Sequence, residues 1–255
     1  MSGFYVTVAR YYDAEHQDKT DDLDMYTELA AEYDGPIFEV GCGTGRVLLH
    51  LARAGNEVDG IDLEAAMLDR ARRKLEAQPL PNARLIQGDV LKYKAERQYN
   101  LVLLSYNALM HFHGQAQQIE LLRRLRALVS NEGLLVIDLP NPADSFAAQD
   151  SDAMIFEKSF IEPESGHLVM QSSISQLDRT EQMLHTQWIY DEISSDGTVR
   201  RTLAPVDFRY FFYSELRLLL QLTGFSVMAA HGSPELDVYE DGCERLIVFA
   251  RPVGQ

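Results

Sequence analysis

The sequence predicts an α/β fold with a mostly parallel sheet, helices on both of its faces, and an antiparallel β insertion. Two observations predict this fold. From residue 36 onward, short and nearly continuous apolar segments alternate with helical patterns, which is typical of parallel strands joined by crossover helices. After Pro140 the pattern changes to β-type segments separated by polar turns, and helical periodicity returns only near residue 213.

The core elements follow in chain order. A first helix is expected at 22–34, ended by Gly35-Pro36. Parallel strands are buried on both faces and therefore strongly apolar; the segments that fit are 36–40, 57–62, 83–89, 99–106 and 133–140. Helices between them are predicted by apolar stripes at helical spacing: Leu48, Leu49, Leu51 with Ala52; Ala66, Met67, Ala71 with Leu75; Ile119, Leu122, Leu125 with Leu128.

The later part of the chain predicts an insertion and a return to the core. Three β segments are expected at 166–178, 181–193 and 198–212, and Asp196-Gly197 is a dipeptide favoured in hairpin turns. Ser214 is expected to cap a helix that Gly224 ends, before two final strands at 225–232 and 244–251. We therefore predict a core of residues 1–143 plus 213–255 with an N-terminal flap helix, and an insertion of residues 144–212 that covers the substrate site.

Composition excludes several classes of protein. The 255 residues include 39 Asp and Glu against 23 Lys and Arg, so the formal net charge is −16. This charge repels nucleic acids and anionic membranes, so we expect a small-molecule substrate, no nucleic-acid partner and no membrane partner. Cys42 and Cys243 form no motif, which is typical of a protein from a reducing compartment. The sequence shows no export signal and no membrane span. It also shows no Cys/His cluster that suggests a metal site. We expect a cytoplasmic protein without a metal.

A glycine-rich turn follows the first predicted parallel strand. Gly41, Gly43 and Gly45 have the spacing G-x-G-x-G, and Glu39 precedes them. Glycine adopts positive φ and has no Cβ, so the backbone of such a turn can approach a bound cofactor closely. A nearby carboxylate disfavours a pyrophosphate and suits a cofactor that has a cationic amino-acid end.

Acidic residues end the next two strands. Asp62 is placed to accept hydrogen bonds from both hydroxyls of a ribose, a feature that nicotinamide-dependent enzymes share. Asp89, in Gly88-Asp89-Val90, is placed to accept one from an adenine amino group. Each Asp alone is equally explained as a helix cap or turn residue. Together with the glycine turn, in this order, they favour a nucleoside site.

These motifs resemble the class I S-adenosylmethionine-dependent methyltransferases over residues 36–140, and again over 211–227. The segments that carry the resemblance are Glu39-x-Gly41-x-Gly43-x-Gly45, 60–72, Gly88-Asp89, 99–112 and 134–138. The resemblance implies a Rossmann-like seven-stranded sheet of order 3-2-1-4-5-7-6 with an antiparallel last strand. It also implies S-adenosylmethionine as cofactor, held by Glu39, Gly41, Gly43, Gly45, Asp62, Asp89 and Val90. We further expect cofactor contacts from Tyr12, Leu63, Met67 and Ser105.

A narrower resemblance concerns the substrate side. Tyr12-Asp13 near the N-terminus and a three-stranded insertion before the late helix resemble small-molecule N-methyltransferases, those of nucleotide-linked amino sugars and of the glycine type. In those proteins the N-terminal segment is a flap and the insertion is a substrate cover. We also expect the insertion to form a homodimer surface.

Several residues are candidates for contact with the methyl acceptor. His111, after the fourth parallel strand, is expected to position the substrate or act as general base, with structural hydrogen bonding as the alternative. Tyr12 is the second catalytic candidate, with Tyr11 beside it; both are equally explained as hydrophobic anchors of a terminal segment. The other expected substrate contacts are Tyr106, Asn107, Arg209 and Tyr210.

The sequence thus predicts a methyltransferase that acts on a nitrogen or oxygen of a small metabolite. A DNA amino-methyltransferase would show Asp or Asn-Pro-Pro-aromatic after the fourth strand, where this chain has Ser105-Tyr106-Asn107-Ala108. Two alternatives remain open: a nicotinamide-dependent oxidoreductase, and a non-catalytic S-adenosylmethionine-binding protein.

Overall fold

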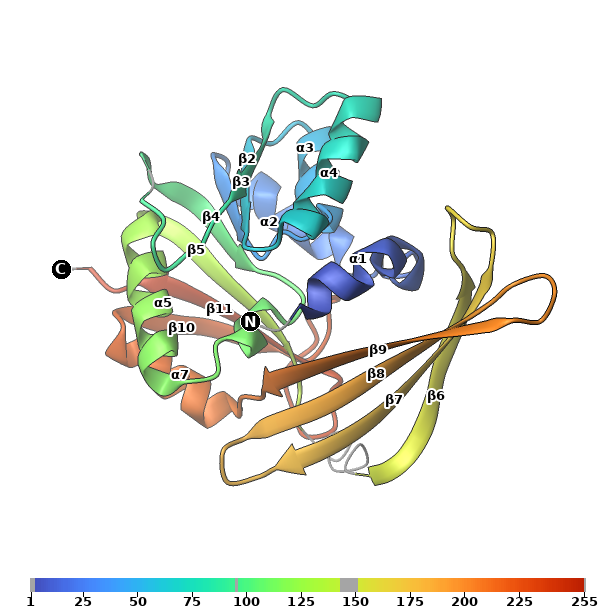
Figure 1. The fold of residues 1–255 in the computed structure, drawn as a ribbon. Helices are drawn as coiled ribbons and strands as arrows, with labels where there is room; N and C mark the ends of the chain where they lie inside the picture. The colour runs from blue at the N-terminus through green and yellow to red at the C-terminus, as the bar shows by residue number, and fades with distance from the viewer. Residues whose placement is uncertain (1–2, 95, 143–150, 255) are drawn as a thin grey trace. The chain divides into compact units, whose positions relative to one another are not determined.

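The computed structural model describes residues 3–94, 96–142 and 151–254 (Figure 1). The chain divides into two compact units. The core unit comprises residues 20–142 and 211–255, and the insertion unit comprises residues 1–19 and 143–210. No helix among the described residues is long and apolar enough to span a membrane.

A seven-stranded sheet forms the centre of the core unit (Figure 1), in the order β10-β11-β5-β4-β1-β2-β3. Its strands are β1 (Ile37–Val40), β2 (Val58–Asp62), β3 (Ala83–Gln87), β4 (Tyr99–Leu104), β5 (Val129–Pro140), β10 (Phe225–His231) and β11 (Arg245–Pro252). β1 to β5 pair in parallel, while β11 runs antiparallel to both β5 and β10. Counted along the core, this is the order 3-2-1-4-5-7-6 that the resemblance implied, and the prediction is confirmed.

Helices cover both faces of this sheet (Figure 1). They are α2 (Leu23–Glu32), α3 (Arg46–Arg53), α4 (Ala65–Ala77), α5 (Gln115–Leu128) and α7 (Tyr213–Leu222). α2, α3 and α4 share one hydrophobic cluster with alternate residues of the strands, such as Leu101 and Leu103. α5 and α7 contact each other, α5 also β4 and β5, and α7 also β10. Because β1 to β5 run parallel, their carboxyl ends lie at the same end of the sheet, where the glycine turn follows β1.

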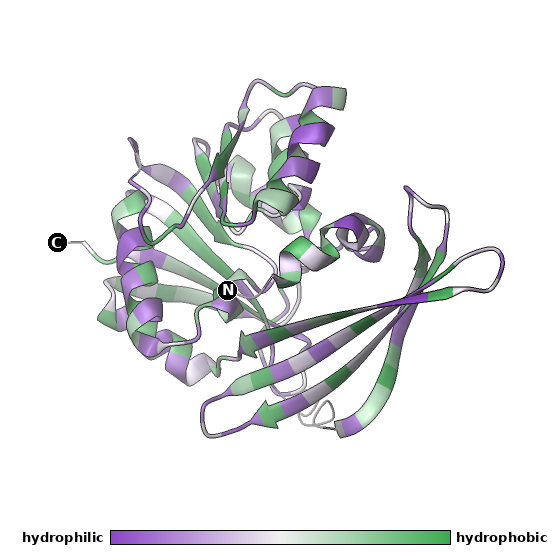
Figure 2. Cartoon of the chain, in the orientation of Figure 1, coloured by the Kyte–Doolittle hydropathy of each residue, from purple (hydrophilic) through white to green (hydrophobic). Residues whose placement is uncertain are grey.

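The insertion unit contains a four-stranded antiparallel sheet in the order β6-β7-β8-β9. Its strands are β6 (Ser151–Ile161), β7 (Leu168–Asp178), β8 (Met183–Ile193) and β9 (Val199–Arg209). Buried residues alternate with more exposed ones along most of β7, because successive side chains point to opposite faces of the sheet. Figure 2 shows that the strands of this sheet carry both hydrophobic and hydrophilic segments. The Asp196-Gly197 turn joins β8 to β9 as predicted, with Gly197 at φ +85°. Helix α1 (Phe4–Glu15) packs through Phe4, Val8 and Tyr11 on one face of the sheet.

Several elements differ from the sequence prediction. The sequence predicted an N-terminal flap helix but did not place it at residues 4–15, where α1 lies, and residues 1–19 group with the insertion rather than with the core. β6 was also missed, because its register shifts between Ser151 and Ile155, and again between Phe156 and Lys158, so its side chains do not alternate regularly. The predicted boundary between residues 143 and 144 lies outside the described residues. The second boundary between the two units lies after Tyr210, whereas the sequence predicted it after residue 212.

Ser214 does not cap the late helix. α7 begins at Tyr213 with Phe212 as its N-cap residue, and no side-chain hydrogen bond caps it. Ser214 therefore lies inside the first turn. Gly224 follows the helix at φ +87°, a left-handed conformation that suits glycine and ends the helix as predicted.

Candidate functional site

The glycine turn, residues Gly41–Gly45, leads from β1 into α3. Gly43 has φ +55°, and its backbone N–H donates a hydrogen bond of 2.8 Å to Oδ2 of Asp62. Gly45 has φ +81°, and a Cβ there would lie 3.0 Å from Cγ of Leu49 in α3. The turn therefore requires glycine at both positions, for its backbone conformation and for the close approach of the helix.

Glu39 lies two residues before Gly41, the first residue of this turn, and is 2% exposed. Its Oε1 accepts a hydrogen bond of 2.6 Å from the Ser105 hydroxyl, whereas its Oε2 has no partner among the described residues. Burial raises the pKa of Glu39 to about 7, although the Ser105 hydrogen bond and the Arg46 charge act in the opposite direction. A buried carboxylate oxygen without a partner is costly, and a cationic group would satisfy it.

Asp62 connects the end of β2 to the glycine turn. Its Oδ2 accepts from Gly43, and its Oδ1 accepts a hydrogen bond of 2.8 Å from the backbone N–H of Glu64. Burial raises the pKa of Asp62, and these backbone hydrogen bonds oppose that rise. A carboxylate has about four acceptor positions, so Asp62 can still accept hydrogen bonds from two hydroxyl groups. Leu63, next to it, is 39% exposed.

The other predicted adenosine contacts lie near this edge in different roles. Met67 is buried, and its Cε lies 3.5 Å from the position that a Cβ on Gly43 would take, so it packs beneath the turn. Asp89 accepts a hydrogen bond of 2.9 Å from the backbone N–H of Leu91, which is the turn role that the sequence left open. Val90 is buried.

The residues after β4 have an unusual backbone. Tyr106 has φ +37° and Asn107 has φ +70°. A residue other than glycine in this left-handed backbone conformation costs about 1–3 kcal/mol of stability, and such residues are enriched at functional sites. The backbone N–H of Asn107 donates a hydrogen bond of 2.9 Å to the carbonyl oxygen of Asp138 at the end of β5. The Tyr106-Asn107 turn is thus held in a strained conformation directly after Ser105.

The structure adds two arginines that the sequence analysis did not identify. The guanidinium carbons of Arg46 and Arg245 each lie 5.5 Å from the centre of the Tyr106 ring. No sequence signal could have identified Arg245, because it is far from Tyr106 along the chain. Arg46 directly follows the last glycine of the turn, and this position was the only available signal.

His111 ends a 3₁₀ turn, Ala108–His111, and is half-buried. Burial, together with the nearby His113, lowers the pKa of His111 to about 4. The imidazole is therefore neutral near pH 7, and one ring nitrogen retains a lone pair that can accept a hydrogen bond.

Four of the predicted site residues belong to the insertion unit. Tyr11 is 1% exposed, stacks on Tyr190 at 4.8 Å and donates a hydrogen bond of 3.2 Å to Glu192, which is the anchoring role left open above. Tyr12 is half-buried and stacks on His16, the C-cap residue of its helix. Arg209 donates to a backbone carbonyl, and Tyr210 pairs through its backbone with Gln182. Their contact with a substrate stays a prediction.

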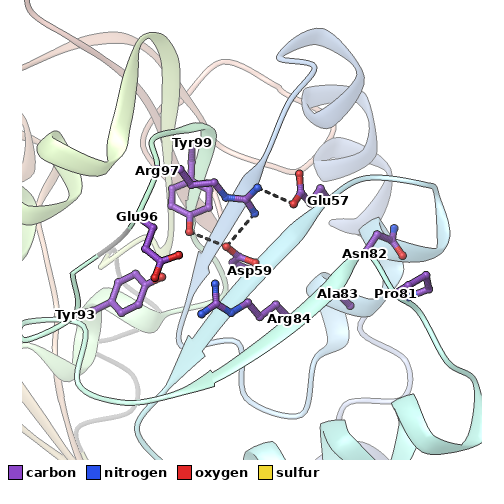
Figure 3. Close-up of a pocket in the computed structure, with 10 residues that line it drawn as sticks. All are labelled: Glu57, Asp59, Pro81, Asn82, Ala83, Arg84, Tyr93, Glu96, Arg97 and Tyr99. Carbon is purple, nitrogen blue, oxygen red and sulfur yellow. Dashed lines mark hydrogen bonds and ion pairs between the residues drawn. The ribbon is translucent and has the colours of Figure 1, made fainter.

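The core unit also contains a cavity of about 310 Å³ at the other end of its sheet (Figure 3). Residues at the amino ends of β2, β3 and β4 line it, among them Asp59, Arg84 and Tyr99. The glycine turn lies at the carboxyl ends of the strands, so this cavity is not the predicted cofactor site. In the described part of the chain, no group of three or more His, Cys, Asp or Glu is arranged to hold a metal.

Comparison with known proteins agrees with this geometry. Residues 37–133 match the family of methyltransferase domains. Over 138 residues the chain is 33% identical to dTDP-3-amino-3,6-dideoxy-alpha-D-glucopyranose N,N-dimethyltransferase of Streptomyces fradiae, covering 51% of this chain and 52% of that protein. It is 23% identical over 212 residues to cypemycin N-terminal methyltransferase of a Streptomyces species, covering 83% and 81%. The chain thus matches about half the length of the first of these curated relatives.

Two solved structures resemble almost the whole chain. The CcbJ methyltransferase from Streptomyces caelestis has a TM-score of 0.76 and 25% identity, over 95% of this chain and 96% of that one. An S-adenosylmethionine-dependent methyltransferase from Clostridium acetobutylicum has a TM-score of 0.81 and 14% identity, over 98% and 99%. The sheet order and the glycine turn define a methyltransferase fold. Residues 37–133 of the chain form a class I S-adenosylmethionine-dependent methyltransferase domain, and the comparisons do not support the oxidoreductase or the non-catalytic binding protein.

Proposed function

We propose that the protein transfers a methyl group from S-adenosylmethionine to an amine nitrogen of a small metabolite. The observation that carries this proposal is the buried Glu39 beside the glycine turn, whose Oε2 has no partner among the described residues. A cofactor with a cationic amino-acid end fits this oxygen. An amine acceptor is supported by relatives named as amino-sugar N,N-dimethyltransferases and as an N-terminal methyltransferase. An oxygen acceptor is the alternative within the same class.

The residues at the carboxyl ends of the strands fit the parts of this cofactor. Glu39 and the backbone of Gly41–Gly45 would hold its amino-acid end, and Asp62 its ribose. Asp89 with Val90 would hold the adenine, and Leu63, Met67 and Ser105 would complete the contacts. Bound S-adenosylmethionine supplies an activated methyl group on a sulfonium. The protein's tasks are therefore to orient the acceptor and to exclude water.

Proton transfer is the remaining chemical task. An amine attacks only when it is unprotonated, and neutral His111 can accept a hydrogen bond from the acceptor N–H and so orient its lone pair. The methylated ammonium product then loses its proton to water. Tyr106 and Asn107, which directly follow Ser105, are the proposed contacts of the acceptor in the core unit. Tyr12, Arg209 and Tyr210 stay proposed contacts from the insertion unit.

Calorimetry with S-adenosylhomocysteine tests the cofactor, and release of S-adenosylhomocysteine from S-adenosylmethionine tests the reaction. The acceptor assay compares a dTDP-linked 3-amino sugar with the same sugar carrying a hydroxyl at that position. We expect binding, and turnover with the amine only. Failure to bind S-adenosylhomocysteine, or a rise in Tm with NADH instead, would overturn the proposal. Turnover with the hydroxyl sugar alone would replace the amine by an oxygen acceptor.

We also propose that the insertion sheet forms a homodimer. The sheet face opposite to α1 exposes Ile161, Leu168, Met170, Val199 and Leu203. Ile161 pairs with Leu168 across β6 and β7, so these side chains form part of a continuous apolar surface. Light scattering should give a dimer for the wild type and a monomer for Leu203→Glu. A monomeric wild type at high concentration would contradict the dimer.

A further inference from the structure

Arg245, the first residue of β11, makes three kinds of contact at the carboxyl edge of the core sheet. Its Nη2 lies 2.6 Å from Oδ1 of Asp138, and its Nε also donates to this oxygen, at 2.9 Å. The same Nη2 donates a hydrogen bond of 3.0 Å to Oδ1 of Asn107. Its guanidinium carbon lies 5.5 Å from the centre of the Tyr106 ring. One side chain therefore contacts both residues of the strained turn and the strand beside it.

The charges of this cluster are already balanced. The side chain of Arg245 is 13% exposed, and that of its partner Asp138 is 1% exposed. Arg46, on the Tyr106 ring as well, forms two hydrogen bonds of 2.5 and 2.7 Å with the buried carboxylate of Asp22. Because each guanidinium has its own carboxylate, the cluster offers no uncompensated positive charge to an anionic substrate. Its arrangement suits the fixing of a ring rather than the binding of a phosphate.

The turn that Arg245 contacts is connected to the cofactor side of the site. Asn107 is held twice, by its backbone N–H on the Asp138 carbonyl and by its side chain on Arg245. Ser105, the residue before Tyr106, donates to Glu39. A shift of the Tyr106-Asn107 turn would therefore move the proposed acceptor contacts. It would also move Ser105, which donates to Glu39.

We propose that Arg245 is a positioning residue for methyl transfer, which acts by holding Tyr106 and Asn107 where they align the acceptor. This inference rests on the proposed function. Arginine is required because a planar guanidinium can bond a carboxylate and an amide oxygen while it lies against an aromatic ring; lysine cannot do all three. Misplacement of an acceptor by about 1 Å can cost on the order of 100-fold in rate, so loss of the guanidinium should lower kcat more than it weakens cofactor binding.

The test compares Arg245→Lys with Arg97→Lys. Arg97 lies at the opposite end of the same sheet, where it also pairs with an aspartate and lies on a tyrosine ring. S-adenosylhomocysteine affinity is measured by calorimetry, and kcat and KM are measured with the dTDP-linked 3-amino sugar. We expect Arg245→Lys to lower kcat by roughly 30-fold while the cofactor Kd changes by less than about threefold. Arg97→Lys should leave both unchanged.

Two further variants keep the proposal testable if Arg245→Lys is unstable. Asp138→Asn with Arg245→Gln removes both charges, so no buried charge remains unpaired, and it should show the same loss of kcat. In Arg245→Gly, added guanidinium at millimolar concentration should restore part of kcat, which a merely structural role does not predict.

The outcomes separate this inference from the proposed function. A wild type that neither binds S-adenosylhomocysteine nor turns over any acceptor overturns the proposed function. Wild-type turnover with an unchanged kcat in Arg245→Lys overturns only the positioning role. An equal loss of kcat in Arg97→Lys also overturns it, because the effect would then not depend on the Tyr106-Asn107 turn.

Discussion

The two ends of the core sheet each contain an aspartate, an arginine and a tyrosine in contact, yet the two groups differ in their surroundings. At the amino end, Asp59 accepts hydrogen bonds from Arg97 at 3.0 Å and from the Tyr99 hydroxyl at 2.7 Å. At the carboxyl end, Asp138 accepts from Arg245 at 2.6 Å and, at 3.4 Å, from the hydroxyl of Tyr26, whereas the tyrosine whose ring lies on Arg245 is Tyr106, in a strained turn.

The difference shows which features mark a functional edge. The amino end has the cavity, but Tyr99 lies in regular strand and its hydroxyl bonds Asp59. At the carboxyl end, Tyr106 and Asn107 have positive φ angles. Oε2 of Glu39, also at this end, has no hydrogen-bond partner among the described residues. Strain and unsatisfied polar atoms have a stability cost that natural proteins retain mainly where function needs it. Substitutions at the carboxyl end should therefore change activity, and those at the amino end should change stability.

The largest expected effect is on the rate. His111→Asn removes the neutral imidazole at the carboxyl end of the sheet and should lower kcat by about 100-fold, since misplacement of an acceptor by about 1 Å can cost on the order of 100-fold in rate. Because the pKa of His111 is about 4, its ionisation should produce no change of rate between pH 5 and 8. Steady-state kinetics would measure this, with the exposed His113→Asn as the matched control. Equal losses in the two variants would exclude a specific role for His111.

The next effect is on cofactor affinity and compares two aspartates of β2. Asp62→Ala should weaken S-adenosylhomocysteine binding by about 30-fold, because hydrogen bonds to a charged group contribute about 1.5–3 kcal/mol. Asp59→Asn, at the amino end of the same strand, should leave the affinity unchanged and lower Tm. Calorimetry and thermal melts measure both. An unchanged Kd in Asp62→Ala would contradict the ribose assignment.

A smaller effect concerns pH and Glu39. The carboxylate form should bind the cationic amino group of the cofactor, and the pKa of Glu39 is about 7. S-adenosylhomocysteine affinity should therefore rise by up to about tenfold from pH 6 to pH 8, with proton release at pH 7 seen as a buffer-dependent binding enthalpy. Glu39→Gln should bind more weakly and show neither effect. A pH-independent affinity in the wild type would count against a cation at this oxygen.

The same ionisation affects the stability of the protein without cofactor. The pKa of Glu39 is raised from 4.5 to about 7, so the folded protein binds more protons than the unfolded chain between these values. The contribution of Glu39 to stability is therefore complete below pH 4.5 and is lost as the pH rises through 7. In denaturant titrations, the wild type should lose stability relative to Glu39→Gln across this window.

Local sequence features predicted that the glycine turn and the acid at the end of the second strand lie together. The G-x-G-x-G spacing and the acid that ends the second strand are local signals, and the structure brings Gly43 within 2.8 Å of Asp62. The strand order was predicted through the family resemblance that these motifs carry, and the structure confirms it. Asp89 shows the limit of such signals, since its side chain bonds the backbone of its own turn.

Long-range contacts could not be predicted from the sequence. Arg245 contacts Asn107 and Asp138 across more than 100 positions of the chain, and no spacing rule connects them. Helix α1 has a weak amphipathic pattern, and its place is set by stacking of Tyr11 on Tyr190. β6 depends on pairing with β7 through shifted register. In each case the partner, rather than the segment itself, determines the structure.

The smallest expected effect is at the amino end. Tyr99→Phe removes the hydroxyl that donates to buried Asp59, while Arg97 still neutralises this carboxylate. The loss should be about 1 kcal/mol of unfolding free energy, the usual net contribution of one hydrogen bond, and the lining of the cavity would otherwise be preserved. Urea titration measures this loss, and calorimetry should find the S-adenosylhomocysteine Kd unchanged. If Tyr99→Phe instead weakened cofactor binding as Asp62→Ala does, the two ends of the sheet would be coupled, and the separation of stability from activity would be wrong.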